Sequence, residues 1–405
     1  MSTSIHSGLF SAEYMRDPYP VYREMRDAGP VHETVGSNGV RVWVITDYAE
    51  ARAALADPRL AKDSVEMGEV LAANRIEAGL GWLPTEETAA HMLNSDPPDH
   101  GRLRRLVSRG FTGRRVQRLR GRIEELSAGL IDRMAARTGP VDLLADYALP
   151  LPMGVIGELV GWPESAHGPL REWTSVLMAS GTTEDITRAS LDMTGYLREL
   201  VAHKREHPAD DLLSALLEHD SADGTLGENE LIAMLVLLVI AGHDTTVNLI
   251  ATGMRQLLRH PDQLALLRAD RSLLPGAIEE FLRIEGPVIN ATARYTSEPV
   301  IYGGVPIPAG QVVLVALTAA NHDPARYPDP GRLDITRSPG GHLGFGHGIH
   351  FCLGAPLARL EAEIAFTQLL DRFGRIELAV PDEDLEFRTG MVIRGIKALP
   401  VNLGT

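Results

Sequence analysis

Apolar residues recur at helical spacing along most of this 405-residue chain. The spacing predicts helices over residues 20–28, 49–56, 99–110, 114–136, 228–259, 275–283 and 355–373. Runs rich in β-branched residues are few: residues 31–46 resemble a hairpin around Ser37-Asn38-Gly39, and residues 298–317 resemble short strands broken by glycines. The pattern predicts a mainly α protein with a minor β region. No repeat or linker divides the chain, so we expect one domain over residues 1–405.

The predicted helix over residues 228–259 is apolar on nearly every face between Leu231 and Ile240, which indicates burial on most sides. At roughly 1.5 Å per residue it is long enough to cross the core. Thr225-Leu-Gly-Glu228 is spaced as a capping box at its start, and Pro261 bounds its end.

Polar residues interrupt this buried helix at Asp244, Thr245 and Thr246. A carboxylate and hydroxyls in a core cost several kcal/mol unless they are paired or line a wet cavity. A structural interpretation pairs Asp244 with a basic side chain and lets both threonines bond to carbonyls one turn earlier. A functional site inside the core is the other interpretation. His243, between them, is expected to be a core histidine whose ring is hydrogen-bonded.

Composition places the chain among soluble globular proteins, with 44% hydrophobic and 23% charged residues. The apolar run over residues 231–242 is shorter than the roughly 20 residues of a membrane span, and the N-terminus does not resemble a signal peptide. We therefore expect a cytoplasmic protein that does not bind membranes.

Charge is distributed unevenly along the chain. The net charge is −15, yet residues 101–122 hold nine arginines and no acid. These arginines are Arg102, Arg104, Arg105, Arg109, Arg114, Arg115, Arg118, Arg120 and Arg122. Such a patch favours an acidic partner. The acidic remainder of the chain and the lack of a nucleic-acid-binding motif argue against nucleic acid.

Cys352 is the only cysteine, which excludes an internal disulfide and leaves either a buried small residue or a lone ligand. Gly346, Gly348 and Gly354 surround it and would let the backbone approach a flat partner closely. The thiol also precedes a predicted helix, whose N-terminal dipole and free N–H groups stabilise a thiolate. A cysteine hydrolase with His347 or His350 as base is an alternative, but no oxyanion hole is evident.

Four motifs together resemble those of the cytochrome P-450 family, of the soluble actinobacterial type. Phe345-x-x-Gly348-x-His350-x-Cys352-x-Gly354 is similar to its haem-binding loop. The other three are Ala241-Gly242-x-Asp244-Thr245, Glu280-x-x-Arg283 and His100-x-x-x-Arg104. The likeness runs from "DPYPVYREMRDAGPVH" to "IRGIKALPVNL". It implies a triangular prism of helices with a long central helix and small sheets.

The resemblance implies haem b as cofactor, with the Cys352 thiolate as the ligand of its iron. The haem-binding residues that it implies are His100, Arg104, Arg294, Phe345, His350, Cys352 and Gly354, with His100, Arg104, Arg294 and His350 at the propionates. Asp244 and Thr245 would be catalytic and would deliver protons to dioxygen.

Glu280 and Arg283 would form a buried ion-pair network with the meander at residues 320–330, a structural role. The family commonly has arginine where this chain has His322, so the third member of the network is left open; Arg326 lies nearby in the sequence.

The implied activity is that of a monooxygenase inserting one oxygen atom of O2 into a hydrophobic small molecule, by hydroxylation or epoxidation. A role in secondary metabolism and antibiotic biosynthesis, on a macrolide or other polyketide, is expected; a steroid, terpenoid or peptide is the alternative substrate. Electrons would come from a ferredoxin and its NAD(P)H reductase, and we expect a monomer. A peroxygenase and a non-catalytic haem-thiolate sensor are rival functions, and Asp244-Thr245 argues against both.

The resemblance also implies which residues line the substrate pocket. They are residues 66–90, 173–197, 288–292 and 391–393, with Leu237, Val239, Ile240 and Val247 of the long helix. Their mostly apolar character suits a hydrophobic molecule of moderate to large size.

Overall fold

The fold was analysed in a computed structural model, which describes residues 9, 11–36, 39–76, 86–178, 182–218, 224–338, 340–388 and 390–404. The longer helices are α2 (Tyr19–Ala28), α3 (Tyr48–Ala56), α4 (Ser64–Ala73), α6 (Asp99–Ser108), α8 (Arg120–Ala135), α9 (Pro150–Val160), α10 (His167–Met178), α11 (Thr183–Glu206), α13 (Glu228–Arg259), α14 (Pro261–Ala269), α15 (Leu274–Glu285) and α17 (Ala355–Arg372). Shorter helices are α1 (Ala12–Arg16), α5 (Glu86–Ala89), α7 (Gly113–Arg118), α12 (Leu212–Glu218) and α16 (Leu317–Asn321). Helices dominate, as the sequence pattern predicts.

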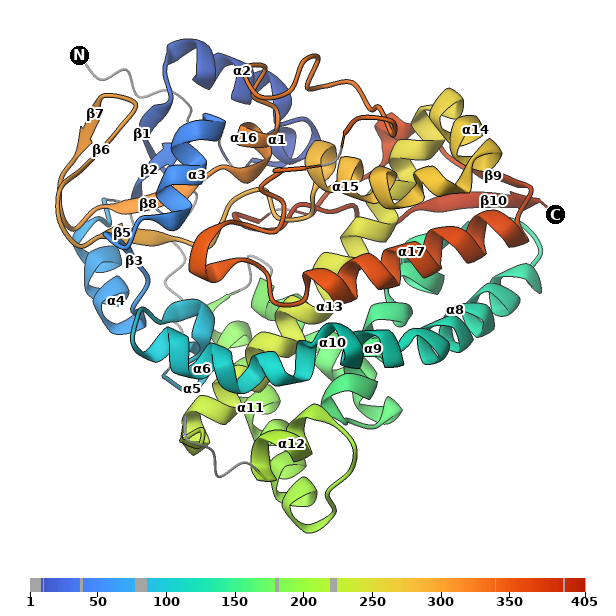
Figure 1. The fold of residues 1–405 in the computed structure, drawn as a ribbon, viewed down its shortest axis with the longest axis horizontal. Coiled ribbons are helices and arrows are strands. Elements are labelled where there is room, and N and C mark those ends of the chain that lie inside the picture. Colours follow the sequence, from blue (N-terminus) through green and yellow to red (C-terminus); the bar gives the residue numbers. More distant parts are fainter. Residues whose placement is uncertain are drawn as a thin grey trace.

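The strands form small sheets at the edges of the helical body. They are β1 (Val31–Val35), β2 (Arg41–Ile45), β3 (Leu60–Ala61), β4 (Val141–Asp142), β5 (Arg294–Thr296), β6 (Val300–Tyr302), β7 (Val305–Ile307), β8 (Val312–Val315), β9 (Arg375–Leu378) and β10 (Pro400–Gly404). One sheet has the order β1-β2-β8-β5-β3, a second β4-β10-β9, and a third β6-β7. Pairing of β2 with β8 is parallel, and the other pairs are antiparallel. Figure 1 shows the five-stranded sheet on the left and an outline that narrows toward α12.

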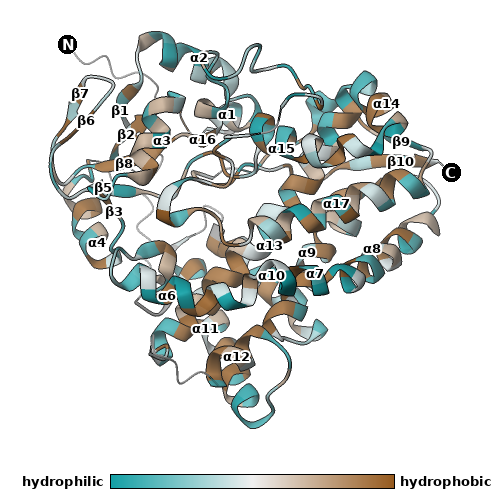
Figure 2. Cartoon of the chain, viewed as in Figure 1, coloured by the Kyte–Doolittle hydropathy of each residue, from teal (hydrophilic) through white to brown (hydrophobic). Residues whose placement is uncertain are grey.

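Helix α13 is the central element and packs against α5, α9, α11, α15 and α17. It is long and apolar enough to cross a membrane by composition, but 72% of its apolar window is buried inside the protein. It is therefore a core helix, and the outer helices α6, α7 and α8 carry more hydrophilic residues (Figure 2). Its N-cap is Gly227, whose N–H donates to Glu230 Oε2 at 2.8 Å, so the expected capping box at Thr225 is wrong. The helix begins at Glu228 and ends at Arg259, as predicted.

Two other predictions differ from the structure. The helix expected over residues 114–136 is two helices, α7 and α8, which are separated at Leu119. Among the longer helices, α4, α9, α10, α11 and α14 were not predicted. Helix α9 is buried over most of its length, so it lacks the polar face that reveals an amphipathic helix. The expected hairpin is formed by β1 and β2, with Ser37 and Asn38 of its turn outside the described residues.

Candidate active site

The loop that precedes α17 is closed by its own backbone. Cys352 N–H donates to Phe345 O at 2.9 Å, and Phe351 N–H donates to Gly348 O at 3.1 Å. Gly346 and Gly348 have φ of 73° and 74°, a left-handed conformation that favours glycine. A Cβ on Gly348 would lie 2.8 Å from Leu55 O of α3, so this residue is glycine for close packing as well.

Cys352 is placed immediately before the N-terminus of α17, as the sequence predicts, and its side chain is accessible to solvent. Burial among protein atoms raises the pKa of the thiol, while the N–H groups of Gly354 and Ala355 and the charge of Arg104 lower it. Gly354 has a negative φ of −79°, and a Cβ there would lie 4.0 Å from Cys352 Sγ. The thiol therefore has the donors that a metal-bound thiolate requires.

Side chains of three helices hold the cysteine loop in place. The guanidinium of Arg359 in α17 lies 4.5 Å from the centre of the Phe345 ring, and Arg104 Nη2 donates to Phe351 O at 2.7 Å. Glu279 of α15 accepts hydrogen bonds from Arg359 at 2.6 Å and from His342 Nε2 at 3.0 Å. Burial opposes ionisation of Glu279, but the bonds from Arg359 and His342 hold its pKa at about 2. Helices α6, α15 and α17 thus all fix this loop.

Three predicted haem-binding side chains form a buried group with unused hydrogen-bonding atoms. The rings of His100 and His350 are 4.4 Å apart, and burial together with neighbouring cations lowers the pKa of His350 to about 2. Within the described part of the chain, His100 Nε2, His350 Nε2 and Arg294 Nε are buried without a hydrogen-bond partner. Buried polar atoms are normally satisfied, so this group is suited to an anionic ligand.

One face of α13 is accessible in the middle of an otherwise buried helix, at Ala241, Gly242 and Thr245. Thr245 Oγ1 donates to Ala241 O at 2.8 Å, one turn earlier. Asp244 is buried, and its Oδ1 accepts a hydrogen bond from Arg388 Nη1 at 2.9 Å. The pairing of Asp244 and the bond of Thr245 to a carbonyl one turn earlier agree with the structural interpretation, and neither contact excludes a functional role.

His243 is buried, and its Nδ1 lies 2.8 Å from Val239 O, as expected of a core histidine. Burial lowers the pKa of its imidazole.

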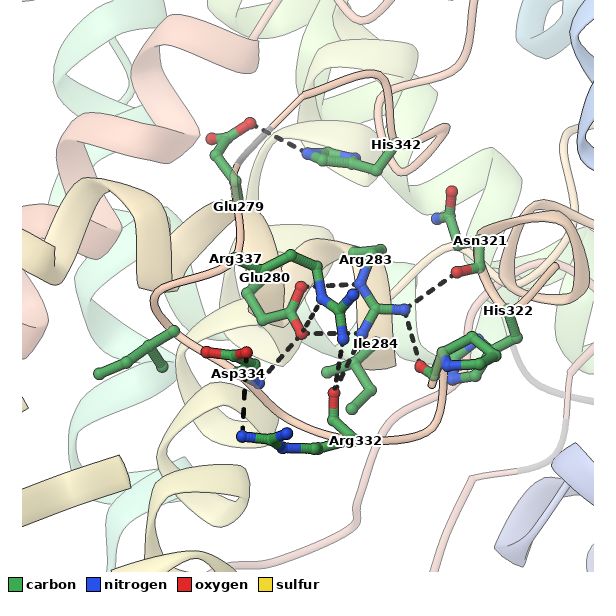
Figure 3. Close-up of polar contacts among 12 residues, drawn as sticks. Glu279, Glu280, Arg283, Ile284, Asn321, His322, Arg332, Asp334, Arg337 and His342 are labelled. Atoms are coloured by element: carbon green, nitrogen blue, oxygen red, sulfur yellow. Dashed lines mark hydrogen bonds and ion pairs between the residues drawn. The ribbon is translucent and has the colours of Figure 1, made fainter. Parts of the chain in front are cut away.

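Glu280 and Arg283 form the buried ion pair that the sequence predicts (Figure 3). Arg283 Nε and Nη2 donate to the two carboxylate oxygens of Glu280 at 2.7 and 2.8 Å. Arg283 also donates to Asn321 O at 3.0 Å and to Pro330 O at 2.8 Å, so it holds the meander from α15. The third charged member is Arg337, whose Nε lies 3.3 Å from Glu280 Oε1.

Neither candidate for the third position of this network contacts Glu280. His322 is buried, its Nδ1 lies 2.9 Å from Thr318 O, and its ring lies 4.6 Å from that of Tyr19. Arg326 stacks on Tyr327 at 4.8 Å and donates to Gly340 O at 3.1 Å. Arg337 was not predicted, because it lies beyond the proline-rich meander at residues 320–330 in which the third member was sought.

Glu280→Gln is expected to lower the free energy of unfolding by about 3–5 kcal/mol, because it leaves the buried guanidiniums without their carboxylate. Urea titration would measure this change. Glu298→Gln is the control, since this exposed acid lies 4.0 Å from Arg59 and should change stability by under about 0.5 kcal/mol. A loss below about 1 kcal/mol for Glu280→Gln would contradict the structural role.

The nine arginines of residues 101–122 are less uniform than the sequence suggests. At least four contact acids: Arg102 with Glu230, Arg115 with Asp210 at 3.5 Å, Arg120 with Glu363 at 3.0 Å, and Arg122 with Glu158 at 2.7 Å. The exposed arginines are Arg105, Arg109, Arg114, Arg118 and Arg122. Because Arg104 reaches Phe351, the surface that α6 contributes lies beside the cysteine loop.

Two of the predicted pocket segments meet in the structure. Ile289 N–H donates to Val392 O at 2.9 Å, and Asn290 Nδ2 donates to Met391 O at 2.7 Å. Parts of two other predicted segments, residues 77–85 and 179–181, lie outside the described residues. Among the described residues, no group of three or more His, Cys, Asp or Glu side chains could hold a metal ion.

Comparison with known proteins agrees with this arrangement. The cytochrome P450 family model matches residues 177–397. Cytochrome P450 107B1 of Saccharopolyspora erythraea is 49% identical over 98% of this chain and 97% of its own, and the cytochrome P450 monooxygenase PikC of Streptomyces venezuelae is 48% identical over 97% and 93%.

A solved structure supports the same relationship. The tirandamycin C-bound P450 monooxygenase TamI has a TM-score of 0.90 and 45% identity over 97% of this chain and 99% of its own. The prediction of a P-450 fold from the four motifs is confirmed. This chain therefore belongs to the cytochrome P450 family and is a monooxygenase with haem b as its cofactor.

Proposed function

We propose that Cys352 binds the haem iron and that the buried group of His100, Arg294 and His350, together with Arg104, holds the propionates. The observation that carries this proposal is the set of unpartnered buried atoms, His100 Nε2, His350 Nε2 and Arg294 Nε, on the described residues. Phe345 and Gly354 would complete the binding loop beside the thiol. The donor set fits an anionic macrocycle with a thiolate-bound iron.

When bound, the haem supplies activation of O2: with two electrons from the reductant and two protons, one oxygen atom enters a C–H bond or adds across a C=C bond of the substrate, and the other leaves as water. We propose that Thr245 and Asp244 move protons toward the accessible face of α13. The Thr245 hydroxyl can accept a proton from one neighbour and pass its own to another. Arg388 would fix the position of Asp244, so that proton exchange with solvent passes through this carboxylate.

The Asp244-Thr245 pair also favours a monooxygenase over the rival functions. A haem-thiolate sensor has no need of a proton relay, and an enzyme that starts from hydrogen peroxide receives its oxygen already protonated. Comparing product formation from O2 and reductant with that from peroxide tests this inference. A faster rate with peroxide at matched saturation would favour a peroxygenase.

The substrate is a small hydrophobic molecule, and we propose that it is a macrolide or another polyketide of antibiotic biosynthesis. Homologous monooxygenases act in macrolide and polyketide tailoring. The segments at Val288–Thr292 and Met391–Ile393 would line one side of the pocket with mostly apolar side chains. A screen of macrolides, steroids, terpenoids and cyclic peptides by substrate-induced shifts of the haem spectrum would rank these classes. Tighter binding of a steroid than of every polyketide would overturn the proposal.

We also propose that an acidic ferredoxin, reduced by its NAD(P)H reductase, docks on the exposed arginines of α6 and α7 beside the cysteine loop. A monomer in the cytoplasm would fit this role, and nucleic acid would not be a partner. Phe351 and Ile349 are exposed next to Cys352 and would supply an apolar centre to the surface.

Charge reversal at Arg105 and Arg109 is expected to reduce ferredoxin-supported turnover by about tenfold and to weaken its dependence on salt, because electrostatic steering is lost. Peroxide-supported turnover should stay within about twofold, since that route needs no partner protein. Stopped-flow reduction at several ionic strengths would measure the effect. Arg188→Glu, an exposed arginine of α11, is the control. Equal losses with ferredoxin and with peroxide would contradict the docking proposal.

A further inference from the structure

Lys62 is a buried amine with little to compensate a charge. It follows β3 directly, its side chain is almost fully buried, and its Nζ donates to the hydroxyl of Thr292. The backbone N–H of Lys62 donates to Asp96 Oδ2 at 2.7 Å, and that of Asp63 donates to the same oxygen at 2.9 Å. A neutral hydroxyl is a weak partner for an ammonium out of water, where a charge requires an opposite charge close by.

The pairing of β3 with β5 places this amine beside Arg294. Leu60 pairs with Thr296 and Ala61 with Tyr295, so the same antiparallel register continued by one residue sets Lys62 opposite Arg294. Arg294 Nη1 donates to Leu60 O at 3.3 Å, which ties the two segments together. Burial, together with the charge of Arg294, lowers the pKa of Lys62 to about 7, although Asp96 opposes the shift.

The wider group is short of negative charge. Lys62 lies near enough to His100 and His91 to lower the pKa of each, after the larger effect of burial. In the described part of the chain, His91 Nδ1, His100 Nε2, His350 Nε2 and Arg294 Nε are all buried without a hydrogen-bond partner. Asp96 is the one acid that acts on both Lys62 and Arg294, and two backbone N–H groups already occupy it.

We infer that Lys62 is a further haem-binding residue, whose ammonium contacts a haem propionate beside Arg294. The inference rests on the haem site proposed above and adds a residue to it from outside the four sequence motifs. A propionate would give the buried ammonium a carboxylate and would use a donor atom of Arg294 at the same time. The two acids of the cofactor would then balance the cationic excess of this group.

The rate of haem transfer from the holoenzyme to excess apomyoglobin tests this inference without any turnover. Lys62→Met removes the charge at similar length, and it should speed haem loss by at least about tenfold, as expected for one charge-assisted hydrogen bond. Lys62→Arg should stay within about threefold of wild type, since it keeps the charge. Lys397→Met, which removes an exposed lysine paired with Glu386, should leave the rate unchanged. If Lys62→Met yields no holoenzyme, Lys62→Gln takes its place.

Two further measurements of haem loss test whether a haem propionate is the partner of Lys62. With the dimethyl ester of haem, which has no carboxylates, wild type and Lys62→Met should lose the cofactor at equal rates. Arg294→Met serves as the reference for the proposed haem site. If Arg294→Met loses haem quickly but Lys62→Met loses it at the wild-type rate, the proposed role of Lys62 is wrong and the propionate site stands. If both variants lose haem at the wild-type rate, the propionate site itself is wrong.

The alternative partner for the Lys62 ammonium is a carboxylate of the substrate, because Thr292 belongs to a predicted pocket segment. Spectral titration with myristic acid and its methyl ester covers this outcome. If Lys62→Met kept the wild-type rate of haem loss but lost a preference for the acid over the ester, the amine would bind substrate, and the inference would be wrong.

Discussion

Cys352→Ala and Cys352→His are expected to lose completely the shifted Soret band that the reduced carbon monoxide complex shows under thiolate ligation. Cys352 is the only thiol in the chain, so no second thiolate can replace it. Alanine leaves the iron without a protein ligand here, and histidine offers a neutral nitrogen that donates less electron density. Monooxygenase turnover should fall to background in both variants. The spectrum of the dithionite-reduced protein under carbon monoxide measures the result.

A matched control separates loss of the ligand from damage to the loop. His347 lies in the same loop, five residues earlier, and makes none of the contacts attributed above to the haem site. His347→Gln should keep the band and turnover, which also tests the alternative of a cysteine hydrolase with this base. Survival of the wild-type band in Cys352→Ala would show that the axial ligand is assigned wrongly.

The fold was predictable where local pattern decides the structure. Helix α13 was found to the residue because its apolar run is long and Pro261 ends it, and α17 was found because apolar residues recur at helical spacing over residues 355–373. Helix α9 was missed because it is apolar on almost every side. The parallel pairing of β2 with β8 joins segments about 270 residues apart, and local pattern gives no register for such a contact.

The candidate site shows the same division between local and distant information. Residues within motifs, such as the Glu280-Arg283 pair, come from one turn of one helix. Arg337 and Arg388 could not be found in this way, because each reaches its carboxylate from an irregular segment far along the chain. Lys62 has a weaker signal, a lone lysine directly after a short apolar strand, whose burial only the fold reveals.

The structure also sharpens the choice between interpretations of Asp244. Its pairing with Arg388 explains how the carboxylate is tolerated in the core, so its burial alone no longer requires a catalytic role. Thr245 is different. Its hydroxyl is satisfied by Ala241 O, yet its face of the helix is accessible, whereas Thr252 bonds in the same way to Asn248 O at 2.6 Å and is buried. Exposure of the side chain therefore distinguishes the two threonines.

Thr245→Ala is therefore expected to reduce product formed per NADPH consumed by at least about tenfold, since a positioned proton donor contributes about 10²–10⁴ to a rate. Haem content and substrate-induced spectral shifts should survive, because the change removes one hydroxyl whose protein partner is a backbone carbonyl. Without proton delivery, reduced oxygen should leave as hydrogen peroxide, which a peroxidase assay measures beside product. Thr245→Ser should restore coupling, and Thr252→Ala, the same change at a buried back-bonded threonine, should leave it intact. Unchanged coupling in Thr245→Ala would reduce this threonine to a structural residue of α13, and an equal loss in Thr252→Ala would point to distortion of the helix instead.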